Sequence, residues 1–150
     1  MGAALAQRLR VPFVDADTLH PLANVAKMAS GEPLDDDDRY PWLERVGEWL
    51  GAQDNGGVVA CSALKRKYRD LLRARCPRVE FLYLHGSPEE IGRRVAARSG
   101  HFMPGALLQS QFETLEPLGA DEPGVTVAVA RGVDTIVDTF LAASATRRRR

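Results

Sequence analysis

A chain of 150 residues that is 45% hydrophobic and 27% charged has enough apolar side chains to build the core of one soluble domain. Its 20 basic and 20 acidic side chains cancel, so the overall charge indicates neither a nucleic-acid partner nor a membrane surface. The two cysteines show no metal-ligand or disulfide spacing, and no apolar run reaches the roughly 20 residues of a membrane span. With no signal peptide in its first residues, we expect a cytoplasmic protein.

The first half of the chain predicts helices and short apolar strands. The expected elements are a helix over residues 2–10, a strand over 11–16, a helix over 24–30 and a strand over 58–61. A longer helix lies between the last two, and either Asp37 or Asp38 can cap it. Pro41 then falls in the first turn of this helix, where its missing N–H is not needed.

The second half continues the alternation. The expected elements are a basic helix over residues 65–75, a strand over 79–84, a helix from 87, a helix over 103–115, a strand over 125–129 and a helix over 133–143. Continuously apolar strands separated by helices are typical of a parallel sheet covered on both faces. We therefore expect an α/β fold in one domain over residues 1–150, with a three-layer parallel sheet and helices on both faces.

Two aspartates end the first predicted strand. Asp15 and Asp17 are two residues apart, so their side chains point the same way, at the strand end where parallel sheets bind ligands. Paired carboxylates suit a magnesium ion or the activation of a hydroxyl group. An Asx turn with a helix cap explains the same two residues equally well.

Basic residues follow the second and third predicted strands. Four of them open the helix after the second strand: Lys65, Arg66, Lys67 and Arg69. Cations at a helix N-terminus oppose the helix dipole, which indicates an anionic partner, although a solvated basic face is the alternative. Arg94 and Arg98 lie one turn apart before Gly100 and His101, either as arginines that close over phosphates or as a solvated helix face.

An acidic run over residues 35–38 precedes the third predicted helix. Its simplest explanation is a helix cap followed by a solvated loop. Arg39, directly after it, could hold a substrate carboxylate in bidentate fashion. His20 has no sharp meaning by itself, because most lone histidines are structural or merely exposed.

Together these segments resemble the gluconate kinase (gluconokinase) family, which is of the shikimate-kinase-like and nucleotide-kinase-like type. The matching stretches include DADTLHP at 15–21, DDDRYPWL at 36–43, CSALK at 61–65, RSGHFMP at 98–104 and LLQSQFETLEP at 107–117. The resemblance covers nearly the whole chain, and the blocks at 38–43 and 101–117 are long and specific. It implies a five-stranded parallel sheet, usually in a homodimer. It also implies transfer of the γ-phosphoryl group of ATP, with Mg²⁺, to the 6-hydroxyl of D-gluconate.

The resemblance also implies roles for individual residues. Asp17 would take or orient the proton of the attacking hydroxyl, and Asp15 would help to order magnesium through water. The residues that would hold gluconate and the moving phosphoryl group are Arg39, Lys65 and Arg69, with His20, Lys27 and His101 as weaker candidates. Arg94 and Arg98 would meet the β- and γ-phosphates of ATP.

One departure from the family lies at the front of the chain. The family has a first strand and a glycine-rich loop before the helix that begins here at Gly2, whereas no G-x-x-x-x-G-K-[ST] occurs in the 150 residues. We therefore expect an incomplete N-terminus, from a start codon assigned too late or an artificial truncation, and a fold that lacks its first strand and phosphate loop. Such a chain should be marginally stable unless the remaining strands close the gap.

We also expect no measurable gluconate-dependent ATP hydrolysis or transfer from residues 1–150 alone. Two alternatives stay open. One is a non-catalytic homologue that binds sugar acids, and the other is a kinase of another small hydroxy acid such as shikimate.

Overall fold

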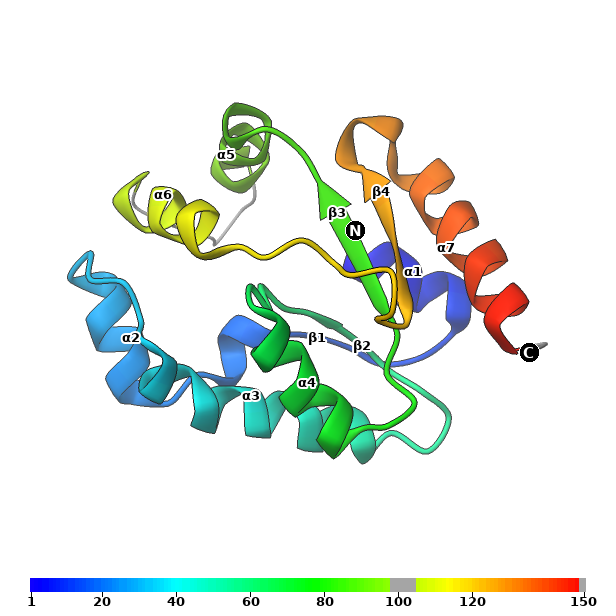
Figure 1. Ribbon diagram of the computed structural model, residues 1–150, viewed down its shortest axis with the longest axis horizontal. Coiled ribbons are helices and arrows are strands. Elements are labelled where there is room, and N and C mark those ends of the chain that lie inside the picture. Colours follow the sequence, from blue (N-terminus) through cyan, green and yellow to red (C-terminus); the bar gives the residue numbers. More distant parts are fainter. Residues whose placement is uncertain (98–104, 149–150) are drawn as a thin grey trace.

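The computed structural model describes residues 1–97 and 105–148 (Figure 1). In chain order its elements are α1 (Gly2–Leu9), β1 (Phe13–Asp15), a 3-10 helix (Ala16–Leu19), α2 (Leu22–Ala29), α3 (Asp36–Gly51), β2 (Val58–Ala60), α4 (Arg66–Arg75), β3 (Phe81–His85), α5 (Pro88–Ala97), α6 (Gly105–Thr114), β4 (Gly124–Ala128), a second 3-10 helix (Val129–Arg131) and α7 (Val133–Arg148). The predicted order of helices and strands is confirmed, with boundaries that shift by a few residues. No helix in this described part is long and apolar enough to cross a membrane.

The strands are parallel, as predicted, but they form two separate pairs. In one pair β1 lies beside β2, with Asp15 opposite Ala60. In the other, β3 lies beside β4, with His85 opposite Ala128. In the described residues no ladder joins β2 to β3, so the expected single sheet is found as two two-stranded sheets.

A large cavity separates the two strand pairs. Its volume is about 2630 Å³, and it is lined by residues of β2 and β3 and by Met1 and Gly2 at the start of α1. The strands of the described chain therefore leave the gap between β2 and β3 open.

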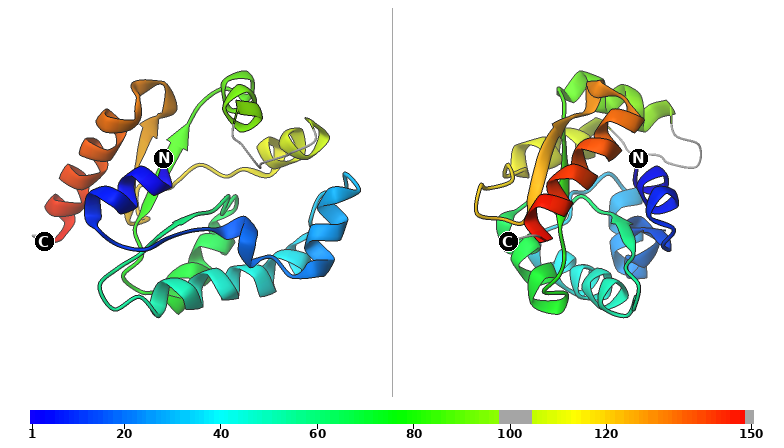
Figure 2. Two further views of the ribbon diagram at one scale, coloured as in Figure 1. Left: turned by 180° about the vertical axis from the view of Figure 1, so that it is seen from behind. Right: turned by 90° about the vertical axis from the view of Figure 1, so that its right-hand side faces the viewer.

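Helices cover both faces of the β1–β2 pair, as expected for a three-layer arrangement. Successive residues of a strand point to opposite faces. Val59 packs against a core from α3 and α4, and Val58 packs against a second core from α1 and α7. Figures 1 and 2 show α3 and α4 side by side on one side of this pair, with α1 on the other and α7 along β4.

The start of α3 differs from the prediction by two or three residues. Asp35 is the N-cap rather than Asp37 or Asp38: its carboxylate accepts the N–H of Asp38 at 2.8 Å, and the Asp38 carboxylate accepts the N–H of Asp35 at 3.0 Å. This reciprocal capping box satisfies two helix-terminal donors at once, which a cap at either later aspartate would not do. Pro41 consequently lies in the second turn of α3, not in its first.

Candidate active site

The ends of β1 and β2 bring the predicted aspartates to one edge of the molecule. The carboxylate of Asp15 accepts the N–H of Asp17 at 3.0 Å and caps the 3-10 helix, so the structure contains the predicted Asx-type cap. Burial raises the pKa of the Cys61 thiol, just beyond β2, to about 12, and the charges of Asp17 and Asp15 add to the shift. Both carboxylates therefore lie close to the carboxyl end of β2.

Three donors from the start of α4 converge on Asp36. The ammonium of Lys65 lies 3.2 Å from its carboxylate, and the Lys67 ammonium and the Tyr68 hydroxyl hydrogen-bond to the same group. The bonds from Lys67 and then Tyr68 hold the pKa of Asp36 well below its usual range. Asp36 is not among the predicted site residues, because residues 35–38 are interpreted from the sequence as a helix cap followed by a solvated loop; the spacing of Asp35 and Asp38 already leaves Asp36 without a capping role.

Arg39 is a buried cation with few protein partners. It is 7% exposed, its guanidinium lies 5.5 Å from the ring centroid of Tyr68, and one NH group donates to the Tyr68 hydroxyl at 3.0 Å. A guanidinium has five N–H donors in a planar fork, and this is its one side-chain hydrogen bond among the described residues. A largely buried guanidinium with donors to spare has the geometry to bind an anion, and the substrate role of Arg39 stays a prediction.

His20 is buried beside Arg39. Its ring stacks on Trp42 with centroids 4.2 Å apart, and its Nδ1 lies 3.2 Å from the Asn24 side-chain amide. Burial, with the charge of Arg39 second, lowers the pKa of His20 to about 4. At neutral pH this side chain is uncharged, so it can offer a substrate a hydrogen bond but no positive charge.

Lys27 pairs with the capping box of α3. Its ammonium donates to Asp38 at 2.7 Å, and this hydrogen bond is the main reason that the pKa of Lys27 rises. Its charge is therefore partly compensated at the N-terminus of α3.

Arg69 lies in the interior rather than at the surface of the site. Its guanidinium is 3% exposed and donates to both carboxylate oxygens of Glu122, at 2.7 and 3.1 Å. It also donates to the carbonyl oxygen of Ala63 at 3.0 Å, in the turn between β2 and α4 where Ala63 has a left-handed φ of 23°. Burial alone would raise the pKa of Glu122, but the hydrogen bonds from Arg69 and the N–H of Gly119 outweigh it and lower the pKa.

The basic residues at the start of α4 predicted an anionic partner. In the described residues their partners are carboxylates of the same chain. Lys65 and Lys67 meet Asp36, Arg66 meets Asp121, and Arg69 meets Glu122. The cations at the start of α4 are therefore paired with carboxylates of the protein itself.

Arg94 lies on α5, near the end of β4. It donates to the carbonyl oxygen of Val129, just after β4, at 3.2 Å and contacts Glu90 at 3.4 Å. It also lines the large cavity. Arg98 and His101 lie outside the described residues, so the predictions for these two side chains stay predictions.

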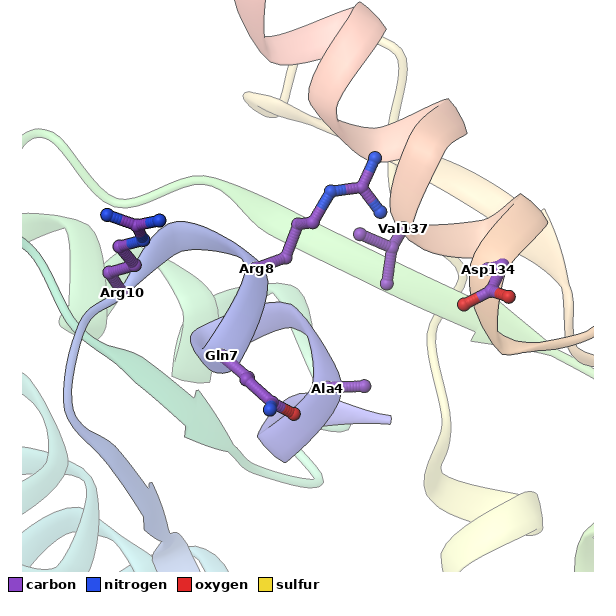
Figure 3. Close-up of a pocket in the computed structure, with 6 residues that line it drawn as sticks. All are labelled: Ala4, Gln7, Arg8, Arg10, Asp134 and Val137. Carbon is purple, nitrogen blue, oxygen red and sulfur yellow. The ribbon is translucent and has the colours of Figure 1, made fainter.

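A smaller hollow of about 430 Å³ lies between α1 and α7 (Figure 3). Arg8 extends toward α7 there, and Arg10 lies at the end of α1. None of the predicted site residues within the described chain lines this hollow, so it is separate from the candidate active site.

Asp15 and Asp17 suit a magnesium site in which the protein supplies only one or two of the ligands. No group of three or more His, Cys, Asp or Glu side chains in the described residues could hold a metal ion alone. Magnesium in kinases keeps several waters and uses one or two carboxylates with substrate phosphates, which Asp15 and Asp17 can supply. The sequence contains no glycine-rich loop of the G-x-x-x-x-G-K-[ST] type, which would hold the phosphates of a nucleotide.

The described fold is α/β with parallel strands, and it has Asp15 and Asp17 at the end of β1 and basic residues at the start of α4; comparisons with known proteins identify its class as a kinase. A family model described as "Shikimate kinase" matches residues 1–116. A gluconokinase of Gluconobacter oxydans (strain 621H) is 43% identical over 144 residues, covering 94% of this chain and 81% of that protein. The thermosensitive gluconokinase of Escherichia coli (strain K12) is 48% identical over 128 residues, covering 83% of this chain and 68% of that protein.

Solved structures give the same result. A gluconokinase from Sinorhizobium meliloti 1021 has a TM-score of 0.85 at 46% identity, covering 97% of this chain and 83% of that one. A sugar kinase from Janibacter sp. HTCC2649 has a TM-score of 0.84 at 40% identity, covering 95% and 86%. The chain belongs to the gluconokinase family, within the shikimate-kinase-like P-loop kinases. The resemblance seen in its motifs and the predicted fold class are both confirmed.

Proposed function

We propose that this kinase transfers the γ-phosphoryl group of ATP to the 6-hydroxyl of D-gluconate and forms 6-phospho-D-gluconate. The observation that carries the proposal is Arg39, a buried guanidinium with spare donors, in a fold that also has two carboxylates, Asp15 and Asp17, at the end of a parallel strand. Gluconate carries its negative charge at one end and the accepting hydroxyl at the other. A site with both a cation and a proton acceptor matches those two ends.

The carboxylate of gluconate binds Arg39, which can form a bidentate pair with it. Lys65, which follows β2, adds a second positive charge for the acceptor or the moving phosphoryl group. His20 offers a neutral ring, and Lys27 and His101 are secondary contacts. Direct contact between gluconate and Arg69 also stays a prediction; its buried bonds to Glu122 and Ala63 favour a role in shaping the turn before α4.

Asp17 takes or orients the proton of the attacking hydroxyl, a task that suits an exposed carboxylate at the strand end. Lys65 stabilises the charge that develops as the phosphoryl group moves. Asp15 would hold Mg²⁺ through water, and the ion when bound neutralises phosphate charge. Arg94 and Arg98 are the proposed contacts of the β- and γ-phosphates.

The remaining parts of the proposal rest on the family resemblance. Residues 1–150 form a single domain of the kinase family, the cofactors of the reaction are ATP and Mg²⁺, the protein lies in the cytoplasm, and two copies associate as a homodimer. Size-exclusion chromatography with light scattering gives the mass directly; a monomer at micromolar concentration would contradict the dimer.

A panel of acceptors tests the function. We expect calorimetry to show saturable binding of D-gluconate to the purified 150-residue chain and much weaker binding of shikimate. Binding of neither acid, or a preference for shikimate, would contradict the proposal. A coupled assay for 6-phospho-D-gluconate on the same sample tests the separate prediction that residues 1–150 alone show no measurable transfer.

A further inference from the structure

The capping of α3 does not explain the position of Asp36. Asp35 and Asp38 complete the capping box between themselves. The side chain of Asp36 is 31% exposed and contacts residues 29 to 32 positions later in the chain, at the start of α4. This carboxylate therefore ties the first turn of α3 to the first turn of α4.

Asp36 fixes the direction of the Tyr68 hydroxyl. Tyr68 is fully buried, and its one O–H proton is donated to Asp36. The oxygen of the same hydroxyl then accepts the N–H of Arg39 at 3.0 Å. Because a phenol has a single proton, its donation to Asp36 turns a lone pair toward Arg39.

Asp36 also holds Lys65. The Oδ1 atom that accepts from Tyr68 lies 3.2 Å from the Lys65 ammonium, which itself lies 5.7 Å from the centroid of the Tyr68 ring. Lys67 bonds to the other carboxylate oxygen and is the largest cause of the lowered pKa of Asp36, but half of its side chain is exposed and the proposed function does not assign it to the acceptor. One negative charge thus sits between the two cations that the proposed function assigns to the acceptor.

We propose that Asp36 is a positioning residue for the acceptor: it holds the Lys65 ammonium directly and the Arg39 guanidinium through Tyr68, and so prepares Arg39 to bind the carboxylate of the substrate and Lys65 to meet the acceptor or the moving phosphoryl group. This inference rests on the proposed function. A long cation that is already held in place loses less rotamer freedom when the ligand arrives. The negative charge also offsets the repulsion that would otherwise separate the two cations.

The opposite role would be that of an internal competitor, in which Asp36 occupies the place of the substrate carboxylate. The geometry disfavours it, because Asp36 reaches Arg39 only through the Tyr68 hydroxyl and leaves the other guanidinium donors uncovered. The two roles predict opposite signs: removal of the Asp36 charge weakens acceptor binding if the residue positions the cations, and strengthens it if the residue competes.

The test measures D-gluconate binding by calorimetry for the wild-type chain, Asp36→Asn, Tyr68→Phe and the double variant. Asp37→Asn is the matched control, because Asp37 is the exposed neighbour in the same turn. We expect Asp36→Asn to raise the Kd about tenfold, the equivalent of one charge-assisted hydrogen bond. Asp37→Asn should stay within about twofold of wild type, as exposed surface substitutions usually do. The double variant should lose less than the product of the two single losses, because Asp36 acts partly through Tyr68.

The outcomes separate the inference from the function on which it rests. If the wild-type chain does not bind gluconate, the proposed function fails and this inference falls with it. If the wild type binds and Asp36→Asn binds equally or more tightly, the positioning role alone is overturned. Should Asp36→Asn fail to fold, Tyr68→Phe decides: unchanged gluconate affinity in that variant overturns the connection to Arg39.

Discussion

At the scale of single residues, burial keeps His20 uncharged at neutral pH. His20 and Arg39 lie in the same buried region, where one cation is retained and the histidine stays neutral. With Nδ1 accepting from Asn24, the ring proton is on Nε2, which is the atom able to donate to a ligand. The site thus combines a permanent guanidinium charge with a neutral imidazole.

We expect the free energy of unfolding to fall as the pH drops from about 6.5 to about 4, because the pKa of folded His20 lies below its unfolded value. In that window the unfolded chain binds the proton and the folded chain does not. Above it both forms are neutral and the contribution is constant. Urea denaturation across this range should show a weaker pH dependence in His20→Gln. His85→Gln, at an exposed position, serves as the control. If the unfolding free energy of His20→Gln depends on pH as strongly as that of the wild type, His20 is not the group responsible.

The Arg69–Glu122 pair should be the most sensitive ion pair to mutation among those described. Its side chains are 3% and 1% exposed, whereas those of the Arg8–Asp138 pair are 52% and 62% exposed. Glu122→Gln leaves a buried guanidinium without its counter-charge, which costs about 3 kcal/mol. Asp138→Asn should cost less than about 1 kcal/mol. Chemical denaturation compares the two variants, and similar losses would show that burial does not govern the pair.

At the scale of elements, the start of α3 uses three of its four aspartates for two tasks. Asp35 and Asp38 close the capping box, and Asp36 reaches α4. We expect Asp35→Ala to lower the unfolding free energy by about 1 kcal/mol through loss of the cap. Asp37→Ala should change it by less than about 0.5 kcal/mol. Thermal unfolding measures both, and equal effects would argue against Asp35 as the cap.

The elements themselves could be predicted because their signals are local. Apolar runs such as residues 58–61, and capping residues such as Ser87, act within a few positions of the chain. The anions that meet α4 could not be predicted in this way. Asp36 lies 29 positions before Lys65, and Glu122 lies 53 positions after Arg69. Only the tertiary fold shows that a basic helix start is neutralised by these distant carboxylates.

At the scale of the whole molecule, two strand pairs lie on either side of the large cavity, and each of the two apolar cores includes residues of both pairs. Cys61 lines this cavity, and burial raises the pKa of its thiol to about 12. We expect Cys61 to resist alkylation at mildly alkaline pH in a Cys76→Ser background, because the thiolate is the reactive form. Mass spectrometry should show slower modification of the native chain than of the chain in denaturant. Equal rates in native and denatured chains would mean that the two strand pairs do not shield this position.

The proposed acceptor site is tested most directly by titrating D-gluconate into the wild-type chain and into Arg39→Met. Arg45→Met, an exposed arginine on the same helix, is the control. We predict saturable binding by the wild type and by Arg45→Met, with affinity reduced by at least about tenfold in Arg39→Met through the loss of a charge-assisted contact. Equal affinity in all three chains, or no binding in any, would contradict the assignment of Arg39 as the group that recognises the substrate carboxylate.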